Sequence, residues 1–365
     1  MIIFQREMII FAIHFHTTTY TSIMKRKIVF VMNPISGTSS KKGIPGIIDS
    51  TLDKDLFDYE IRMTERPGHA SEIASEAKER HVDIVVAVGG DGTVNEVARA
   101  ICQSDTALGI IPCGSGNGLA RHLMIPLSPR KSVEVLNACQ VNRLDYGIIN
   151  GYPFFCTCGM GFDAFVSKKF AEGGKRGPIA YAESVLREGL KYHPETYTLV
   201  DETGTHQHKA FLISCANASQ YGNNAYIAPR ASMSDGFLDV IIMEPFDALE
   251  APQVSFDMFN KTLDMNSKIK TFKCKRLKVR REKPGLIHYD GDPAMAGEEI
   301  DISLVEKGIS VVVNPEGDRR RRRPNVIQTA FAELFNEFNE VRSDLSRQGK
   351  KVEALGKQAR KKLNL

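Results

Sequence analysis

Between Lys27 and Leu144, short apolar runs alternate with amphipathic stretches, and this alternation restricts the fold more than any other feature. The runs Ile84–Val88 and Leu108–Pro112 are apolar throughout, as is typical of strands buried on both faces of a parallel sheet. The pattern is completed by two further strand-like runs and three helical stretches: Ile28–Met32, Tyr59–Met63, Ala70–Arg80, Val94–Gln103 and Lys131–Cys139. Strands that alternate with helices predict a doubly wound α/β domain, with a parallel sheet, over residues 24–144.

After about Asp145 the pattern changes, because β-type segments become more frequent than helical ones. The predicted strands are Tyr197–Val200, Lys209–Cys215, Phe237–Met243, Lys270–Val279 and Ile309–Val313. Helical signal remains at Ala164–Phe170 and Ile179–Lys191. We therefore expect residues 145–317 to form a mainly β second domain, either a sandwich or a flattened barrel.

The two ends of the chain differ from the rest. Residues 318–365 contain five consecutive arginines, Arg319–Arg323, and then apolar residues at spacings of three and four. This pattern predicts a basic amphipathic helix, which packs on protein or lies on anionic lipid. At the other end, Met24 precedes Lys25-Arg26-Lys27 and a clear strand, so residues 1–23 are expected to be a disordered or non-native extension.

The composition indicates in which compartment the protein works and which partners it has. No apolar stretch is long enough to cross a bilayer, so we expect a cytoplasmic protein that is soluble or lies on a membrane surface. The seven cysteines form no C-x-x-C pair and suit reduced thiols in a reducing compartment. The formal net charge is only +4, and we expect no nucleic-acid partner. A homodimer is compatible with the sequence.

The densest motif is Gly89-Gly90-Asp91-Gly92-Thr93, between a predicted strand and a predicted helix. Glycines let the backbone turn tightly and approach a ligand closely. The N-terminus of the following helix offers free N–H groups and a positive dipole end, which suit phosphate. A carboxylate beside phosphates is favourable when Mg²⁺ lies between them, so Asp91 predicts a Mg²⁺-nucleotide site.

Two more polar loops occupy equivalent positions. Gly114–Gly118, which reads Gly-Ser-Gly-Asn-Gly, follows the next strand, and Asn33–Gly37, which reads Asn-Pro-Ile-Ser-Gly, follows the first. The carboxyl ends of parallel strands meet at one edge of a sheet, so the loops should line one crevice. The Walker motif and the dinucleotide fingerprint are both absent, which excludes the two commonest nucleotide-binding loops.

These three motifs resemble those of the diacylglycerol kinase catalytic-domain family, which includes bacterial lipid kinases, sphingosine kinases and ceramide kinases. The resemblance extends from about Lys27 to Asn314. It implies that the first domain binds ATP and that the second, a β-sandwich, helps to bind a lipid. It also implies that the last strand, at about residues 309–314, returns to the first domain.

The resemblance implies nucleotide contacts from several segments of the first domain. Residues 89–95 would wrap the phosphates, and Asp91 would serve Mg²⁺-ATP. The expected nucleotide-binding residues are Asn33, Pro34, Ile35, Ser36, Gly37, Thr64, Gly89, Gly90, Asp91, Gly92, Thr93, Val94, Asn95 and Ser115.

The resemblance also implies roles for residues at the substrate and at metals. Asp145 matches an aspartate of a carboxylate–water–magnesium network at the domain junction. Asp163 matches a position that contacts the polar end of the lipid in sphingosine kinases, although an aspartate here can also be a helix N-cap. Residues 232–239 resemble a segment that holds a structural Mg²⁺, or else form a plain Asp-Gly turn. The expected ligands of that ion are Ser232, Asp235 and Phe237.

Residues 289–293 read Tyr-Asp-Gly-Asp-Pro, where the family usually has Asp-Gly-Glu with the glutamate as general base. Asp292 is therefore the expected catalytic base of this chain. Aspartate has the same chemistry and a similar intrinsic pKa, but its side chain is one methylene shorter. Because a base must approach to about 3 Å, the loop would have to lie closer to the substrate.

Together these features predict a kinase that uses ATP and Mg²⁺ to phosphorylate a hydroxyl group of a membrane lipid, of the diacylglycerol or sphingoid-base type. Two alternatives belong to other classes. A soluble kinase of the NAD kinase or phosphofructokinase type would share the Gly-Gly-Asp-Gly motif. A lipid-binding regulator without catalysis would fit the change from glutamate to Asp292.

Overall fold

The computed structural model describes residues 25–34, 41–171, 192–247 and 249–317. Several predictions concern residues outside these ranges. They are the extension 1–23, the nucleotide contacts of Ile35, Ser36 and Gly37, the helix at Ile179–Lys191 and the amphipathic tail 318–365.

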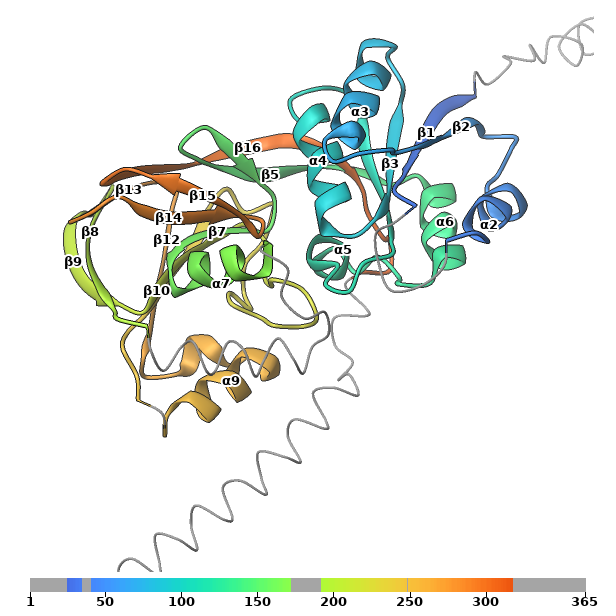
Figure 1. The fold of residues 1–365 in the computed structure, drawn as a ribbon. Coiled ribbons are helices and arrows are strands. Elements are labelled where there is room, and N and C mark those ends of the chain that lie inside the picture. Colours follow the sequence, from blue (N-terminus) through green and yellow to red (C-terminus); the bar gives the residue numbers. More distant parts are fainter. Residues whose placement is uncertain (1–24, 35–40, 172–191, 248, 318–365) are drawn as a thin grey trace, which may run out of the picture.

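The first domain is a parallel sheet with helices on both faces, as predicted (Figure 1). Its strands follow the order β2-β1-β3-β4, where β1 is Arg26–Met32, β2 is Phe57–Met63, β3 is Ile84–Gly89 and β4 is Ala107–Pro112. One face is covered by α3 (His69–Glu79) and α4 (Asp91–Ile101). The other face is covered by α2 (Ile44–Thr51) and α6 (Pro129–Ala138). Because both faces are covered, β3 and β4 are buried along their whole length.

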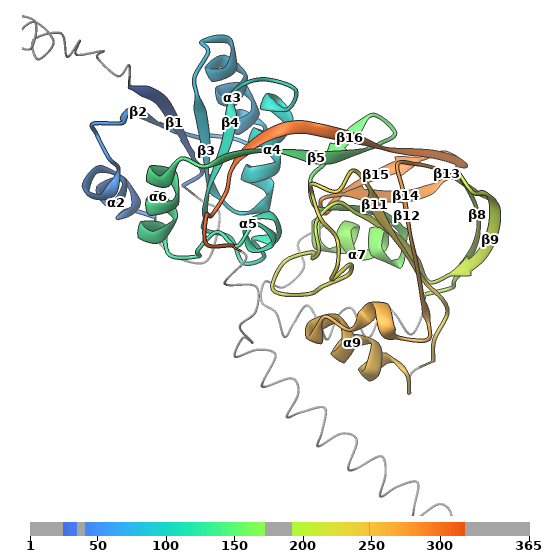
Figure 2. The same cartoon turned by 180° about the vertical axis from the view of Figure 1, so that it is seen from behind.

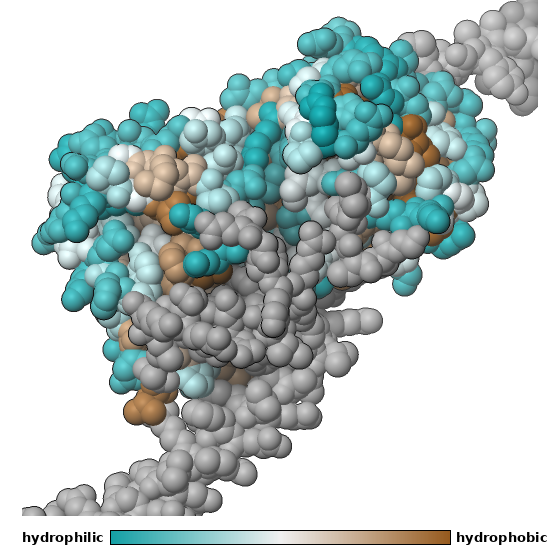
Figure 3. Space-filling view, viewed as in Figure 1, coloured by the Kyte–Doolittle hydropathy of each residue, from teal (hydrophilic) through white to brown (hydrophobic). Residues whose placement is uncertain are grey.

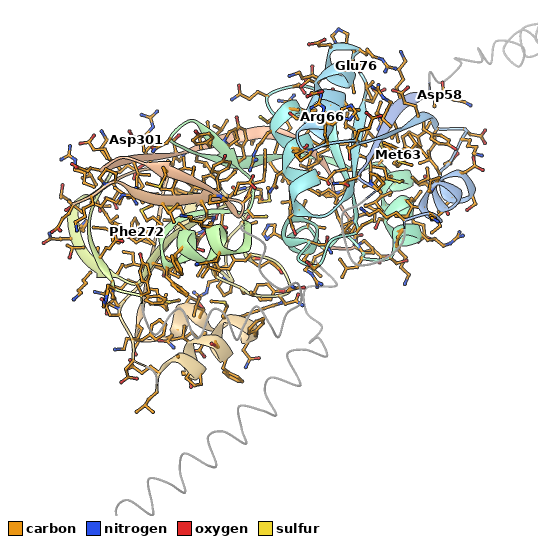
Figure 4. All side chains as sticks on the ribbon, in the orientation of Figure 1. Asp58, Met63, Arg66, Glu76, Phe272 and Asp301 are labelled. Atoms are coloured by element: carbon orange, nitrogen blue, oxygen red, sulfur yellow. The ribbon has the colours of Figure 1, made fainter. Side chains whose placement is uncertain are left out.

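The second domain is a sandwich of antiparallel strands. One of its sheets has the order β12-β11-β10-β7-β14-β15. These strands are β7 (Thr157–Gly161), β10 (Leu212–Ala216), β11 (Leu238–Met243), β12 (Ile269–Cys274), β14 (Gly285–Tyr289) and β15 (Asp292–Ala296). The facing sheet contains β8 (Glu195–Asp201), β9 (Gly204–Ala210) and β13 (Arg276–Arg281). Inward side chains of both sheets form one core, against which Phe272 packs (Figure 4).

Two strands belong to both domains. Strand β5 (Val141–Ile149), which also pairs with β6 (Tyr152–Phe154), runs antiparallel to β16 (Glu299–Val312). At one end β16 pairs with β13 of the sandwich, and at the other it pairs with β4 of the first domain. This two-stranded ribbon crosses from one domain to the other (Figure 2). The point between residues 144 and 145, where the sequence suggests a domain boundary, lies inside β5.

Two segments predicted as single strands are each two strands. Lys209–Cys215 is interrupted at Phe211, and Lys270–Val279 is interrupted at Lys275. In both cases the chain leaves one sheet of the sandwich and enters the other, since β9 and β13 belong to one sheet whereas β10 and β12 belong to its partner. Residues on both sides of such a corner have strand-like composition, so the break leaves little signal in the sequence.

Four further helices lie within the described ranges. They are α5 (Gly118–His122), α7 (Phe162–Ala171), α9 (Ala251–Asn260) and the short 3₁₀ helix η1 (Leu263–Met265). Helix α7 matches the helix predicted over Ala164–Phe170, whereas α5 and α9 were not predicted. Across the described ranges, no helix is both long and apolar enough to span a bilayer.

Candidate active site

The two glycine-rich loops of the first domain touch each other through their backbones. Strands β3 and β4 are neighbours, and Gly89 is opposite Pro112 at their carboxyl ends. A Cβ atom on Gly114 would lie 2.6 Å from the Cα of Gly90, which is closer than real Cβ contacts come. Glycine is therefore required at this contact, and the loops meet without side chains between them.

Asp91 holds the second loop in place. Its Oδ2 accepts a hydrogen bond of 2.8 Å from the Asn117 N–H, and its Oδ1 accepts one of 2.6 Å from the Gly118 N–H. The expected role was contact with Mg²⁺-ATP, and the structure shows a bridge between the two loops. Each carboxylate oxygen keeps a second lone pair, so Asp91 still fits beside a Mg²⁺ ion.

Burial raises the pKa of Asp91, and the amide hydrogen bonds from Gly118 and Asn117 only partly oppose this. A raised pKa means that the folded protein takes up this proton at higher pH than the unfolded chain, so acidification through this group does not destabilise the fold. Protonation removes acceptor capacity that the Gly114–Gly118 loop uses.

We therefore expect the KM for ATP to rise on acidification, starting above the pH of about 3.9 at which an ordinary aspartate is half protonated. The measurement is the pH profile of this KM, with thermal unfolding followed at each pH. An ATP KM that stays constant until the protein unfolds would contradict the role given to Asp91.

The other predicted nucleotide contacts lie around the same edge of the sheet. The Asn33 N–H donates to the Val88 carbonyl at 3.2 Å, and the Thr64 N–H donates to the Met32 carbonyl at 2.8 Å. Thr64 is buried, whereas Ser115 and Gly92 are exposed at the loop surface. Arg66 (labelled in Figure 4), two residues after Thr64, forms an ion pair of 2.6 Å with Glu72 of α3, and both side chains are exposed.

Lys41 is a residue of this edge that the sequence did not single out. Its ammonium is buried and donates to the Asn33 carbonyl. Burial lowers the pKa of Lys41, while the nearby Cys113 thiol raises it. In the sequence Lys41 is one of two adjacent lysines after the first loop, so no pattern distinguished it from a surface residue.

Three polar side chains lie on one face of α4, and two of them join the first domain to the second. Asp91, Asn95 and Arg99 are four residues apart, so they share one face of the helix. The Asn95 side-chain amide donates to the Asp290 carbonyl at 3.4 Å, and Arg99 forms an ion pair of 2.8 Å with Asp292. Arg99 was not predicted as a site residue. It could have been, because a polar residue every four positions on a mostly buried helix indicates a polar contact.

Asp290 is the first residue of the tight turn between β14 and β15, and Asp292 directly follows the turn; the two carboxylates have different partners. Asp290 and Gly291 both have positive φ, as a two-residue hairpin of type I′ requires. The buried Asp290 carboxylate accepts hydrogen bonds from the N–H groups of residues 155, 156 and 157. Asp292 is half exposed and pairs with Arg99, whose guanidinium also lies 4.7 Å from the Tyr289 ring centroid.

Asp163 lies inside the first turn of α7 and is not its N-cap. The Tyr221 hydroxyl donates to Asp163 Oδ2 at 2.9 Å. The Nε2 atom of His288 lies 2.9 Å from the same oxygen, although not aligned as a hydrogen bond. Neither Tyr221 nor His288 was predicted to take part in the site, because an isolated tyrosine or histidine in a β-rich region carries no motif.

The loop that contains Tyr221 rests on the second glycine loop. The Asn223 N–H donates to the Gly116 carbonyl at 3.0 Å, and a Cβ atom on Gly222 would lie 3.0 Å from the same backbone. The buried His122 of α5 accepts from the Ser219 N–H at 3.0 Å. Residues of both domains therefore surround the Gly114–Gly118 loop.

Asp145 supports the crossing ribbon. Its Oδ1 accepts from the Lys307 N–H at 2.7 Å, and its Oδ2 accepts from the Gly236 N–H at 3.0 Å. Lys307 has positive φ and lies where the register of β16 shifts against β5. The structure thus places the Asp145 carboxylate against backbone amides, whereas the expected role was in a magnesium network.

A lysine side chain contacts the segment expected to hold a structural Mg²⁺. The Lys273 ammonium lies 2.6 Å from Asp235 and 3.1 Å from Asp239, and Lys273 is directly opposite Asp239 on neighbouring strands. Burial alone would lower the pKa of Lys273, but the bonds to both carboxylates outweigh it and raise the pKa. Among the described residues, no cluster of three His, Cys, Asp or Glu residues could hold a metal ion. The Lys273 ammonium thus supplies a positive charge beside Asp235, at the segment where the resemblance implies Mg²⁺ with Ser232, Asp235 and Phe237 as ligands.

Replacing Lys273 by methionine removes the positive charge beside Asp235 and Asp239. We expect the free energy of unfolding to fall by about 1 kcal/mol, because the pair is partly exposed. The melting temperature of the variant should rise with added Mg²⁺, whereas that of the wild type should not respond to Mg²⁺ or a chelator. Lys270→Met is the matched control, since Lys270 on the same strand pairs with a single carboxylate among the described residues, that of Glu244. A wild-type protein destabilised by the chelator would contradict the assignment.

Comparison with known proteins finds a family model for each of the two domains. Residues 27–149 match the model of the diacylglycerol kinase catalytic domain. Residues 156–301 match the model of the YegS C-terminal NAD kinase beta sandwich-like domain.

Individual relatives span both domains. A protein named probable lipid kinase YegS-like from Chromohalobacter salexigens is 28% identical over 70% of this chain and 84% of its own length. A diacylglycerol kinase from Staphylococcus saprophyticus is 28% identical over 62% of this chain and 76% of its own. A solved diacylglycerol kinase structure from Bacillus anthracis shares the fold, with a TM-score of 0.62 and 20% identity over 80% of this chain and 97% of that one. The chain belongs to the diacylglycerol kinase catalytic-domain family.

Proposed function

We propose that this protein is an ATP-dependent lipid kinase that transfers the γ-phosphate to a hydroxyl group of a membrane lipid. The observation that carries the proposal is the polar face of α4. Asp91 at its start holds the glycine loops together, and Asn95 and Arg99 hold the Asp290–Asp292 hairpin of the second domain. A nucleotide on the loops and an acceptor on the second domain would meet beside this helix.

The residues have distinct tasks in phosphoryl transfer. The backbone N–H groups of the glycine loops stabilise charge on the phosphates, and the loop contacts keep them in position. Asp91 would hold Mg²⁺, which would neutralise charge on the phosphates when bound with ATP. Asp292 accepts the proton of the attacking hydroxyl, for which it must exchange Arg99 for the substrate.

The first test is phosphate transfer from labelled Mg²⁺-ATP to lipids in mixed micelles. The acceptors are diacylglycerol, sphingosine, ceramide and phosphatidylglycerol, with NAD and fructose 6-phosphate as soluble controls. We expect label on at least one lipid and none on the soluble acceptors. Label on a soluble acceptor alone would place the protein in the NAD kinase or phosphofructokinase class, and no transfer at all would favour a regulator without catalysis.

We further propose that the protein works at the cytoplasmic surface of a membrane. Apolar residues reach the surface of the second domain around α9, where Leu249 and Met265 are 70% and 73% exposed (Figure 3). The basic segment 318–365 of the sequence would add attraction to anionic lipid, at about 1 kcal/mol per cation near the surface.

Deleting residues 318–365 should therefore weaken binding to anionic vesicles at least tenfold, which corresponds to about 1.4 kcal/mol. ATP affinity should change little. Vesicle sedimentation and nucleotide titration measure the two effects, and neutral vesicles serve as the control. Unchanged sedimentation with anionic vesicles would show that this segment packs on protein instead.

A further inference from the structure

The start of α3 is capped by a carboxylate from another helix. Glu96 lies in α4, and its Oε1 accepts a hydrogen bond of 3.2 Å from the Gly68 N–H, while its Oε2 accepts one of 3.2 Å from the Ala70 N–H. Gly68 is the N-cap residue of α3 and has no side chain that could cap the helix itself. A carboxylate at this end also faces the positive end of the helix dipole. Glu96 therefore supplies a cap that the local sequence lacks.

The bonds to Glu96 complete the pairing of the backbone at this helix start. The N–H groups of residues 69, 71 and 72 donate to backbone carbonyls within the same segment. Those of Gly68 and Ala70 donate to Glu96. Removing the Glu96 carboxylate would leave these two partly or fully buried donors to water, at a cost in free energy that reordering of the segment can relieve.

The segment that Glu96 holds begins at a predicted nucleotide contact. We call residues 64–68 the β2–α3 turn. Its first residue, Thr64, is buried, and the Thr64 N–H donates to the Met32 carbonyl at the carboxyl end of β1. Residues 65–67 in the middle of the turn are exposed. The sheet thus fixes one end of the β2–α3 turn, and Glu96 fixes the other.

Helix α4 also carries the opposite side of the nucleotide site. Asp91, five residues before Glu96, accepts hydrogen bonds from the Gly114–Gly118 loop. Asp91 and Glu96 belong to one continuous helix, so the spacing between them is rigid. Glu96 therefore sets where the β2–α3 turn lies relative to the glycine loops.

Apolar packing joins the two helices independently of Glu96. Ile73 and Ala74 of α3 are buried in the same apolar core as Val97 and Ala98 of α4. Loss of the Glu96 carboxylate should therefore leave both helices in place and release only the turn. This separates a local effect on the site from a general loss of structure.

We propose that Glu96 is a positioning residue for the nucleotide, which holds the β2–α3 turn so that Thr64 faces ATP bound on the glycine loops. This inference rests on the proposed function and adds to it a residue that touches neither substrate. Because the turn lies away from the Asp290–Asp292 hairpin, Glu96 should influence ATP affinity and not the transfer step.

The first test measures the ATP and lipid constants of Glu96→Ala. Loss of two hydrogen bonds to a carboxylate should raise the KM for ATP, and the Kd for Mg²⁺-ATP titrated without lipid, by about tenfold or more. The kcat at saturating ATP and the lipid KM should stay near the wild-type values. Glu96→Gln keeps one acceptor oxygen and should raise the ATP constants less. Glu72→Gln is the matched control, because Glu72 lies in the first turn of the same helix but is exposed and pairs with the Arg66 side chain.

A double-mutant cycle tests whether Glu96 acts through Thr64. Thr64→Val removes the hydroxyl with little change in volume and should raise the Kd for Mg²⁺-ATP. In the Glu96→Ala background the same change should add much less, because the turn is already displaced. Fully additive effects, or an unchanged Kd in Thr64→Val alone, would overturn the inference.

Two further results would also contradict this role. One is an ATP affinity of Glu96→Ala equal to that of Glu72→Gln. The other is a rise in the ATP and lipid KM values alike together with a large fall in melting temperature, which would show a purely structural role. A wild type that binds Mg²⁺-ATP but transfers phosphate to no lipid would overturn the proposed function alone, since the titration needs no acceptor.

Discussion

Replacing Asp91 by asparagine should lower kcat/KM for phosphate transfer by about a hundredfold to a thousandfold. The side chain keeps its volume, but an asparagine offers only one acceptor oxygen, and its NH₂ group would face a backbone N–H. Either the Asn117 or the Gly118 hydrogen bond is then lost, together with the charge expected beside Mg²⁺. Initial rates at varied ATP and fixed lipid measure the effect.

The control for Asp91→Asn is Asp257→Asn. Asp257 is also buried and also accepts several hydrogen bonds, but it lies in α9 of the second domain. Both variants should have a lower melting temperature than the wild type. Only Asp91→Asn should also lose most of its kcat/KM when it is assayed at a temperature where it is folded. Near wild-type turnover in Asp91→Asn would show that the nucleotide site is assigned to the wrong residues.

Replacing Asp292 by asparagine should lower kcat by at least a hundredfold if its carboxylate is the general base. Asp292 also pairs with Arg99 of the first domain, so its replacement could lower kcat either by removing the base or by breaking this contact between the domains. A second variant distinguishes the two causes. Arg99→Met removes the same ion pair and leaves the carboxylate in place. We expect Asp292→Asn to be much the more damaging of the two, measured by kcat at saturating ATP and lipid.

Equal losses in Asp292→Asn and Arg99→Met would mean that Asp292 acts only through the ion pair. Asp292→Glu gives the family residue at this position and should keep activity. Asp105→Asn provides a surface control, since its pair with Arg143 also measures 2.8 Å but joins no part of the site.

The fold could be predicted from the sequence where periodicity is strong. Strands β3 and β4 are continuous apolar runs because helices cover both faces of their sheet, and short apolar runs that end in glycine loops are typical of such buried strands. The corners at Phe211 and Lys275 could not be predicted, since a change of sheet alters neither the composition nor the alternation of the residues beside it.

The residues of the candidate site likewise include some that could be predicted from the sequence and some that could not. The glycine loops could be found because backbone contacts such as that of Gly90 with Gly114 demand a particular residue type. Arg99, Tyr221 and His288 could not, because they act on groups nearly 200, 58 and 125 residues away in the sequence. Lys273 also could not be predicted as a partner of residues 232–239, because it lies 38 residues from Asp235 in the sequence and reaches it from a neighbouring strand.

The ribbon of β5 and β16 has a consequence for biosynthesis. The sheet of the nucleotide domain is completed by Val311 and its neighbours beside β4, about two hundred residues after β4 itself has been translated. During synthesis on the ribosome, β4 therefore waits with an open edge until nearly the whole sandwich domain has emerged. The domain that comes first in the sequence is the last to be finished, so both halves of this enzyme must mature together.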